Sequence, residues 1–164
     1  EETYSIEQYW SEDLVTFLLG CSFSFEHALL EAGISLRHID QGKNVAMYKT
    51  NIPTEIAGDF HGPLVASMRP IKKDRIIETI AITSKLEKAH GAPIHVGNPE
   101  KIGIDDISDP DYGEFVEIRE DEEPVFWACA VTPQAVALES KPSLMMTHTP
   151  GHMFITDLVF TDIG

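Results

Sequence analysis

VFWACAVTPQ, residues 125–134, is the stretch of sequence that decides the fold. Residues 125–131 form an unbroken apolar run of strand length, which is typical of a strand buried on both faces, as in a parallel sheet. Thr132 and Pro133 follow as a helix cap and a proline at the first helical position, so a helix is expected from residue 132 to about residue 139. The stretch predicts a buried strand that leads directly into a helix.

Helical and strand signals alternate outward from this stretch. Caps and apolar spacing predict helices over residues 11–20, 24–33 (with Ser24 as N-cap) and 72–89. Short apolar runs predict strands over residues 45–48, 64–68, 94–96, 115–118, 144–146 and 153–155. We expect an α/β fold: a mixed sheet core flanked by helices, made by residues 1–35 and 91–164, with residues 36–90 as a small inserted α+β subdomain.

Composition narrows the class of partner. The chain has 164 residues, and 43% of them are hydrophobic, which is enough for a real core. The formal net charge of −15 argues against nucleic acid and anionic membrane, because both would repel such a surface. A small-molecule carboxylate or amino acid is the expected partner, and a homo-oligomer stays open.

Cysteine usage and the termini favour an intracellular protein. Two cysteines, Cys21 and Cys129, do not make a disulfide framework. The first residues show no signal peptide, and no apolar run reaches the length of a membrane span. We expect a cytoplasmic protein, or a mitochondrial-matrix protein for a eukaryotic homologue. Because the chain starts at Glu1 and not at Met, a fragment of a longer protein stays open.

Two segments offer groups that could hold an anion. Ser22 and Ser24 stand at a helix entry, where free backbone amides and the helix dipole favour negative charge. Thr132 and Gln134 follow the buried strand, at the kind of strand end where ligands sit in α/β sheets. Cys129 could be a catalytic nucleophile or an unreactive core residue. Its apolar neighbours favour the second interpretation.

Two histidine pairs offer acid–base chemistry. His90 and His95, and also His148 and His152, flank short segments that contain proline and glycine. Such segments fix a tight backbone path that can aim imidazoles into a pocket. Neither spacing matches a helical zinc motif, so proton transfer is the first interpretation and metal binding the second.

Several of these segments together resemble the YcsI-like hydro-lyase family, which includes D-glutamate cyclase. The resemblance runs in family order over nearly the whole chain, through LGCSFSFE (19–26), RHI (37–39), MYKTNIP (47–53), HGP (61–63), SMRP (67–70), HGAPIH (90–95), FWAC (126–129), VTPQ (131–134) and PGHM (150–153). The chain matches the C-terminal portion of the family sequence, whose N-terminal region is absent. It departs from the family pattern at Ala46, Asn98, Ala130 and Thr149.

The resemblance implies a hydro-lyase that removes water from a small amino or carboxylic acid, with D-glutamate closing to 5-oxo-D-proline in the cyclase branch. We assign proton transfer first to His148 and His152 and second to His90 and His95. The substrate-binding residues follow from residue type and place in the sequence. Ser22, Ser24 and Thr132 are expected to hold the oxyanion or a carboxylate, and Arg69 and Asn51 to anchor the charged end of the substrate. Gln134 is expected to reach the same crevice as Thr132. No cofactor is expected. The alternatives are a metal-dependent lyase or hydrolase that uses the same histidines, with a divalent ion, and a non-catalytic carboxylate-binding regulatory domain.

Overall fold

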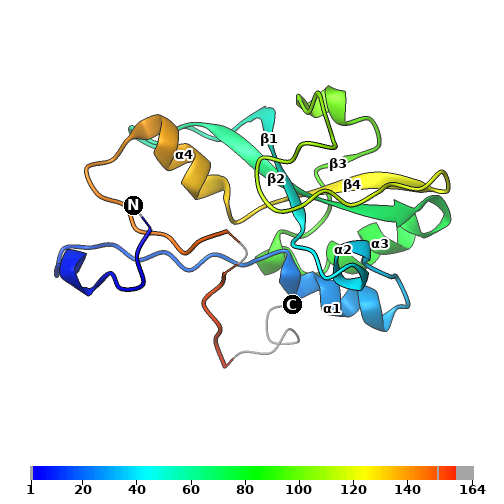
Figure 1. Cartoon of the computed structure of the whole chain (residues 1–164), viewed down its shortest axis with the longest axis horizontal. Coiled ribbons are helices and arrows are strands. Elements are labelled where there is room, and N and C mark those ends of the chain that lie inside the picture. Colours follow the sequence, from blue (N-terminus) through cyan, green and yellow to red (C-terminus); the bar gives the residue numbers. More distant parts are fainter. Residues whose placement is uncertain (1, 151, 158–164) are drawn as a thin grey trace.

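A four-stranded sheet forms the centre of the molecule. The structure, a computed structural model, describes residues 2–150 and 152–157 (Figure 1). The strands lie in the order β1-β2-β4-β3, and each neighbouring pair is antiparallel. Their bounds are β1 Ala46–Pro53, β2 Pro63–Lys72, β3 His95–Val96 and β4 Glu122–Ala128.

Within the described residues, four α-helices and four 3₁₀ turns connect and cover the strands. The α-helices are α1 Phe23–Glu31, α2 Arg37–Asp40, α3 Ile76–Thr83 and α4 Thr132–Ser140. The 3₁₀ turns are η1 Glu7–Tyr9, η2 Lys73–Arg75, η3 Glu87–Ala89 and η4 Pro99–Ile102. Helices α1 to α3 lie on one side of the sheet, and the segment 97–121 crosses the other side (Figure 1). Helix α4 packs against β2.

The alternation of side chains along β2 and β4 decides what each face of the sheet buries. Ala66, Met68 and Phe126 point to the face covered by the segment 97–121 and join one apolar cluster with Ile102, Ile104 and Val116. Ile71, Val125 and Trp127 point to the opposite face and pack against Phe25 and Leu29 of α1. Ser67 and Arg69 share this second face by their spacing, and they are therefore buried beneath α1.

The expected mixed sheet is wrong for the described residues, because every strand pairing among them is antiparallel. The apolar run at residues 125–131 indicated burial on both faces correctly, yet burial does not fix strand direction. Here an irregular segment covers one face and helices cover the other. The α/β content is confirmed. The division into a core and an inserted 36–90 subdomain stays a prediction, although β1 and β2 share one sheet with β4.

Several predicted elements differ in extent. No α-helix spans residues 11–20, where Val15, Phe17 and Leu18 are 76%, 77% and 77% exposed. A helix there would gain no packing from its apolar face, and short helices depend on such packing. The predicted helix over 72–89 is reduced to α3 between two 3₁₀ turns, and α1 begins after Ser22, so Ser24 is not its cap. Residues 115–118, 144–146 and 153–155 are not strands.

The remaining predictions are confirmed at their centres. Strands occupy residues 45–48, 64–68 and 94–96 to within a few positions, and α4 starts at Thr132 with Pro133 in its first turn. The prediction that Thr132 caps this helix is wrong, because Val131 is the N-cap and no side chain makes a capping hydrogen bond. Within the part of the chain that the structure describes, no helix is both long and apolar enough to cross a membrane.

Candidate active site

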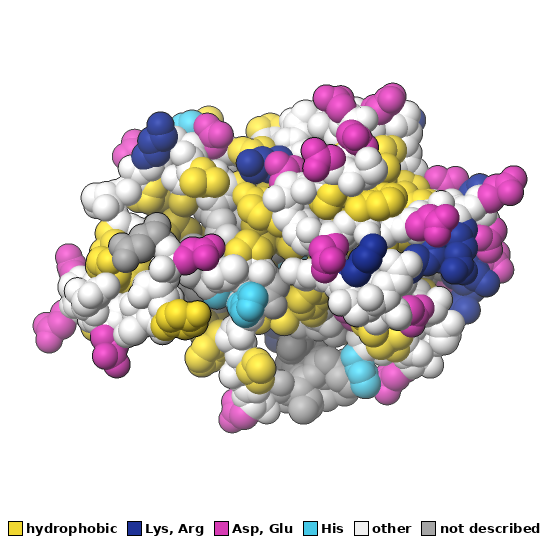
Figure 2. Space-filling model, viewed as in Figure 1, with side chains coloured by type: hydrophobic (Ala, Val, Ile, Leu, Met, Phe, Trp, Pro, Cys, Tyr) yellow, Lys and Arg dark blue, Asp and Glu magenta, His cyan; other side chains and the backbone are white. Residues whose placement is uncertain are grey.

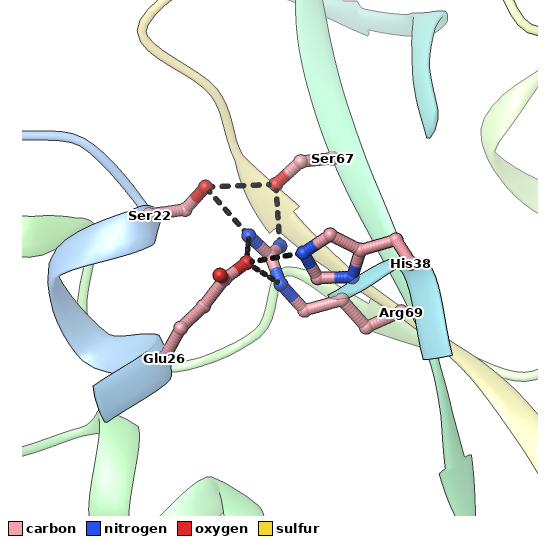
Figure 3. Close-up of polar contacts among 5 residues, drawn as sticks. All are labelled: Ser22, Glu26, His38, Ser67 and Arg69. Carbon is pink, nitrogen blue, oxygen red and sulfur yellow. Dashed lines mark hydrogen bonds and ion pairs between the residues drawn. The ribbon is translucent and has the colours of Figure 1, made fainter. Parts of the chain in front are cut away.

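The buried guanidinium of Arg69 lies at the centre of a polar cluster between β2 and α1 (Figure 3). Its Nε donates to Glu26 Oε1 at 2.8 Å, and its Nη1 donates to Ser67 Oγ at 3.0 Å. Its Nη2 donates to Ser22 Oγ at 3.1 Å and also to Glu26. We call Ser22, Glu26, His38, Ser67 and Arg69 the Arg69 cluster.

The geometry of α1 and β2 explains why the side chains of the Arg69 cluster face one another. Ser22 immediately precedes α1 and Glu26 lies four positions later, so both side chains lie on the same face of the helix. Ser67 and Arg69 are two positions apart on β2 and project to the same face of the sheet. The rings of Phe25 and Trp127 complete the enclosure, with centroids 4.9 Å and 5.5 Å from the Arg69 Cζ. Arg69 therefore carries its charge inside the protein.

Glu26 balances that charge. Burial alone would raise its pKa, but the charge of Arg69 and the hydrogen bond and charge of His38 outweigh burial, so the pKa of Glu26 lies below its ordinary value. His38 Nε2 lies 3.1 Å from Glu26 Oε1. The other ring nitrogen of His38 is buried without a hydrogen-bond partner among the described residues. The cluster is thus an ionised carboxylate–guanidinium pair with hydroxyl and imidazole partners.

A pocket of about 410 Å³ opens beside the loop that joins β4 to α4. We call it the His90 pocket. Its lining residues are Leu19, Gly20, Leu64, Lys88, His90, Ala128, Cys129, Ala130, Thr132 and Pro133. Acidic side chains are spread over the molecular surface (Figure 2), yet none belongs to this lining. The pocket is therefore mainly apolar despite the net charge of −15.

His90 belongs to the lining of this pocket, and one of its ring nitrogens has no hydrogen-bond partner among the described residues. Its Nε2 is buried and has no hydrogen-bond partner within residues 2–150 and 152–157. Burial and then the charge of Arg69 lower the pKa of His90, and a hydrogen bond to the Gly20 backbone opposes them in part. Because Nε2 has no partner, that bond belongs to Nδ1–H, which donates to the Gly20 carbonyl. A neutral His90 then carries a lone pair on Nε2.

The backbone around His90 is tightly specified. His90 has a φ of 76°, in the left-handed region that few residues other than glycine and asparagine adopt readily. A Cβ at Gly20 would lie 1.7 Å from the Lys88 carbonyl oxygen, so only glycine permits this approach of residue 20 to η3. Gly20 does not end a helix, since no α-helix spans residues 11–20. Its structural role is to bring residues 19–20 against the turn that carries His90.

Four of the residues assigned from sequence gather here. Ser22 and Arg69 belong to the Arg69 cluster, and His90 and Thr132 line the pocket. The charge of Arg69 acts on both His90 and Cys129, so the cluster and the pocket form one electrostatic unit. The Thr132 hydroxyl accepts from the Val65 N–H at 3.0 Å and ties α4 to β2. Arg69 does not reach solvent in this conformation, so a direct contact with a substrate carboxylate stays a prediction.

The other assigned residues lie apart from the pocket lining. His95 Nε2 lies 2.7 Å from the Asn98 carbonyl, and Asn51 is exposed beside Gly103. Gln134 donates to the His148 carbonyl at 2.8 Å, while Ser24 is half-buried within α1. His148 and His152 are exposed, and their Nδ1 atoms lie near carbonyls of their own segment. Gly151, between them, lies outside the described residues. The catalytic roles of these histidines stay predictions.

Sequence reasoning did not assign roles to Glu26, His38 or Ser67. A signal for Glu26 existed in its four-residue spacing from Ser22, and a signal for Ser67 in its two-residue spacing from Arg69. Nothing local marks His38, since it meets Glu26 only through the turn between α1 and α2.

Burial raises the pKa of both Cys21 and Cys129, so both thiols are protonated near neutral pH. This agrees with the interpretation of Cys129 as an unactivated residue. Over the described ranges, no group of three or more His, Cys, Asp or Glu side chains could hold a metal ion.

Comparisons with known proteins place this chain among related sequences. A family model described as D-glutamate cyclase matches residues 15–157. A protein of Verminephrobacter eiseniae named "Putative hydro-lyase" is 57% identical over 99% of this chain and 59% of its own length. Proteins of the same description from Geobacillus kaustophilus and Staphylococcus haemolyticus are 58% and 57% identical over 100% of this chain, and over 62% and 63% of their own lengths. The chain thus spans about three fifths of the length of these relatives.

Proposed function

The chain belongs to the D-glutamate cyclase family, and from that premise we propose that its His90 pocket removes water from a small amino or carboxylic acid. D-Glutamate, which would close to 5-oxo-D-proline, is the proposed substrate. The observation that carries the proposal is the buried, unpartnered Nε2 of His90 in a mainly apolar pocket, within the field of Arg69. A mere carboxylate-binding module would not need a poised proton acceptor.

The proposed reaction conserves atoms and charge. The substrate amine attacks its own side-chain carboxyl carbon, so a C–N bond forms and a tetrahedral oxyanion appears. Counted from the ammonium and carboxylate forms, two protons leave the nitrogen in all, a C–O bond breaks, and the departing carboxylate oxygen takes up two protons to leave as water. Ring closure is intramolecular, so the barrier lies mainly in the proton transfers and in the oxyanion.

The residues of the pocket suit these demands. His90 Nε2 accepts the proton from nitrogen and returns it to the departing hydroxide, because a neutral imidazole near its pKa serves both steps. The charge of Arg69 reaches the pocket, since it lowers the pKa of His90. The same charge favours a developing oxyanion. The Thr132 hydroxyl and the Gly20 segment line the space in which that oxyanion would form. Glu26 acts through Arg69 as a positioning residue.

We expect the chain to convert D-glutamate into a product lighter by one water, with 5-oxo-D-proline identified by chiral chromatography and mass. The assay includes other small amino and hydroxy acids and is repeated after exhaustive chelation, and the result expected is chelator-insensitive turnover. Activity lost on chelation and restored by a divalent ion would instead support the metal-dependent alternative. Binding without water loss from any acid would support the non-catalytic alternative and contradict the proposal.

A further inference from the structure

The charged groups around the His90 pocket are unfavourable for a cationic ligand. The titratable residues of its lining are Lys88, His90 and Cys129, and none of them is a carboxylate. Behind the lining lie Arg69, whose charge acts on His90 and Cys129, and the Cys21 thiol. Glu26 is already paired with Arg69 and His38. Glu87 directly precedes Lys88 in η3, but its side chain is exposed and does not belong to the lining.

An α-amino acid brings an ammonium group into this environment. Burial in an apolar pocket disfavours the charged form of an amine, and a neighbouring cation disfavours it further. The lining offers the ammonium no anion to offset the lost hydration. His90 of the lining has a buried Nε2 with no hydrogen-bond partner among the described residues. The lone pair of a neutral imidazole nitrogen can receive an N–H of a neutral amine once the two groups come into contact.

We propose that the His90 pocket binds its amino-acid substrate in the neutral-amine form and so selects the protonation state that can close the ring. The inference rests on the proposed function and deepens it by naming the state of the substrate. An ammonium nitrogen has no lone pair with which to attack a carboxyl carbon. A pocket that excludes the ammonium therefore performs the first proton loss as part of binding: this proton passes to water, and one proton is taken up again from water when the carboxylate oxygen departs.

The pH dependence of substrate affinity tests this inference independently of turnover. If only the amine form binds, the affinity for D-glutamate rises about tenfold per pH unit while the pH stays below the pKa of the free amine. Glutarate has the same two carboxyl groups and lacks the amine, so its affinity is expected to stay flat over the same range. Affinities are measured by stopped-flow mixing before the first turnover, from about pH 7 upward, where His90 is neutral.

A matched pair of variants tests the electrostatic cause. Ala130→Asp adds a carboxylate to the lining, and Ala130→Asn adds a side chain of the same size without the charge. We expect Ala130→Asp to bind D-glutamate with an affinity that no longer changes with pH. Ala130→Asn is expected to keep the tenfold slope of the unmodified chain. Folding of both variants is checked by near-ultraviolet circular dichroism.

The possible failures are distinguishable. An affinity of the unmodified chain for D-glutamate that is flat with pH overturns this inference and leaves the proposed reaction standing. The same holds if glutarate shows the same slope as D-glutamate, because the slope would then belong to the protein. Binding of glutarate without binding of D-glutamate at any pH overturns both the inference and the proposed substrate.

Discussion

Replacing His90 with Asn is expected to slow water loss from D-glutamate roughly 10²–10⁴-fold, the range typical of a lost general acid–base group. Asn tolerates the left-handed backbone at this position, where φ is 76°, so the turn after η3 is retained. An amide can still receive an N–H, but it cannot accept the proton. The loss should therefore fall on kcat, with KM changed little.

A histidine elsewhere provides the control for this variant. His27 lies on α1 beside Glu31, at a 3.3 Å contact, and is not part of the pocket lining. His27→Gln should keep the rate of the unmodified chain, and both variants should keep its circular dichroism spectrum. A folded His90→Asn protein that turns over D-glutamate at the unmodified rate would remove His90 from the mechanism.

Replacing Arg69 with Met is expected to lower the free energy of unfolding by about 3–5 kcal/mol, because it leaves a buried carboxylate without its partner. Arg69 is 0% exposed and the Glu26 side chain is 9% exposed, so little water reaches either group. The loss is measured by urea unfolding monitored by circular dichroism. Adding Glu26→Gln to Arg69→Met should cost less than the sum of the two single changes, since the double variant buries no unpaired charge.

A surface pair gives the matched control for this second variant. Lys73 and Glu123 also form an ion pair, at 3.6 Å, but their side chains are 54% and 38% exposed. Lys73→Met should change the free energy of unfolding by no more than about 1 kcal/mol. Equal losses for Arg69→Met and Lys73→Met would contradict the account of a buried and energetically coupled cluster.

The parts of the fold that sequence could predict are those set by local chemistry. Pro133 marked the start of α4 because the fixed proline φ acts on its own residue, whereas the hydroxyl of Thr132 bonds Val65 of β2 and does not cap the helix. The apolar run at residues 125–131 reported burial on both faces, but the direction of its neighbours depends on distant strands. Residues 11–20 had the apolar spacing of a helix, yet no described element packs on the side chains of Val15, Phe17 and Leu18. Spacing alone could not show this.

Some residues of the candidate site could be predicted from the sequence, but their contacts could not. Local chemistry singled out Ser22, Arg69, His90 and Thr132, and the structure gathers all four in the Arg69 cluster and the pocket lining. The ion pair of Arg69 with Glu26 joins residues 43 positions apart, so only the packing of α1 on β2 reveals it. The sequence could not show which histidine is best placed for proton transfer. His90 is distinguished by a buried Nε2 without a hydrogen-bond partner among the described residues, and both properties depend on the fold.

The measurement that tests the central claim most directly is an NMR titration of the histidine ring nitrogens in the ¹⁵N-labelled chain. The account predicts that His90 is the neutral Nδ1–H tautomer and that its pKa lies below the ordinary value of 6.5, because burial and the charge of Arg69 both disfavour the imidazolium. It also predicts that added D-glutamate shifts the Nε2 resonance of His90 and leaves those of His148 and His152 in place. A D-glutamate response at His148 or His152, with the His90 resonances unchanged, would contradict it.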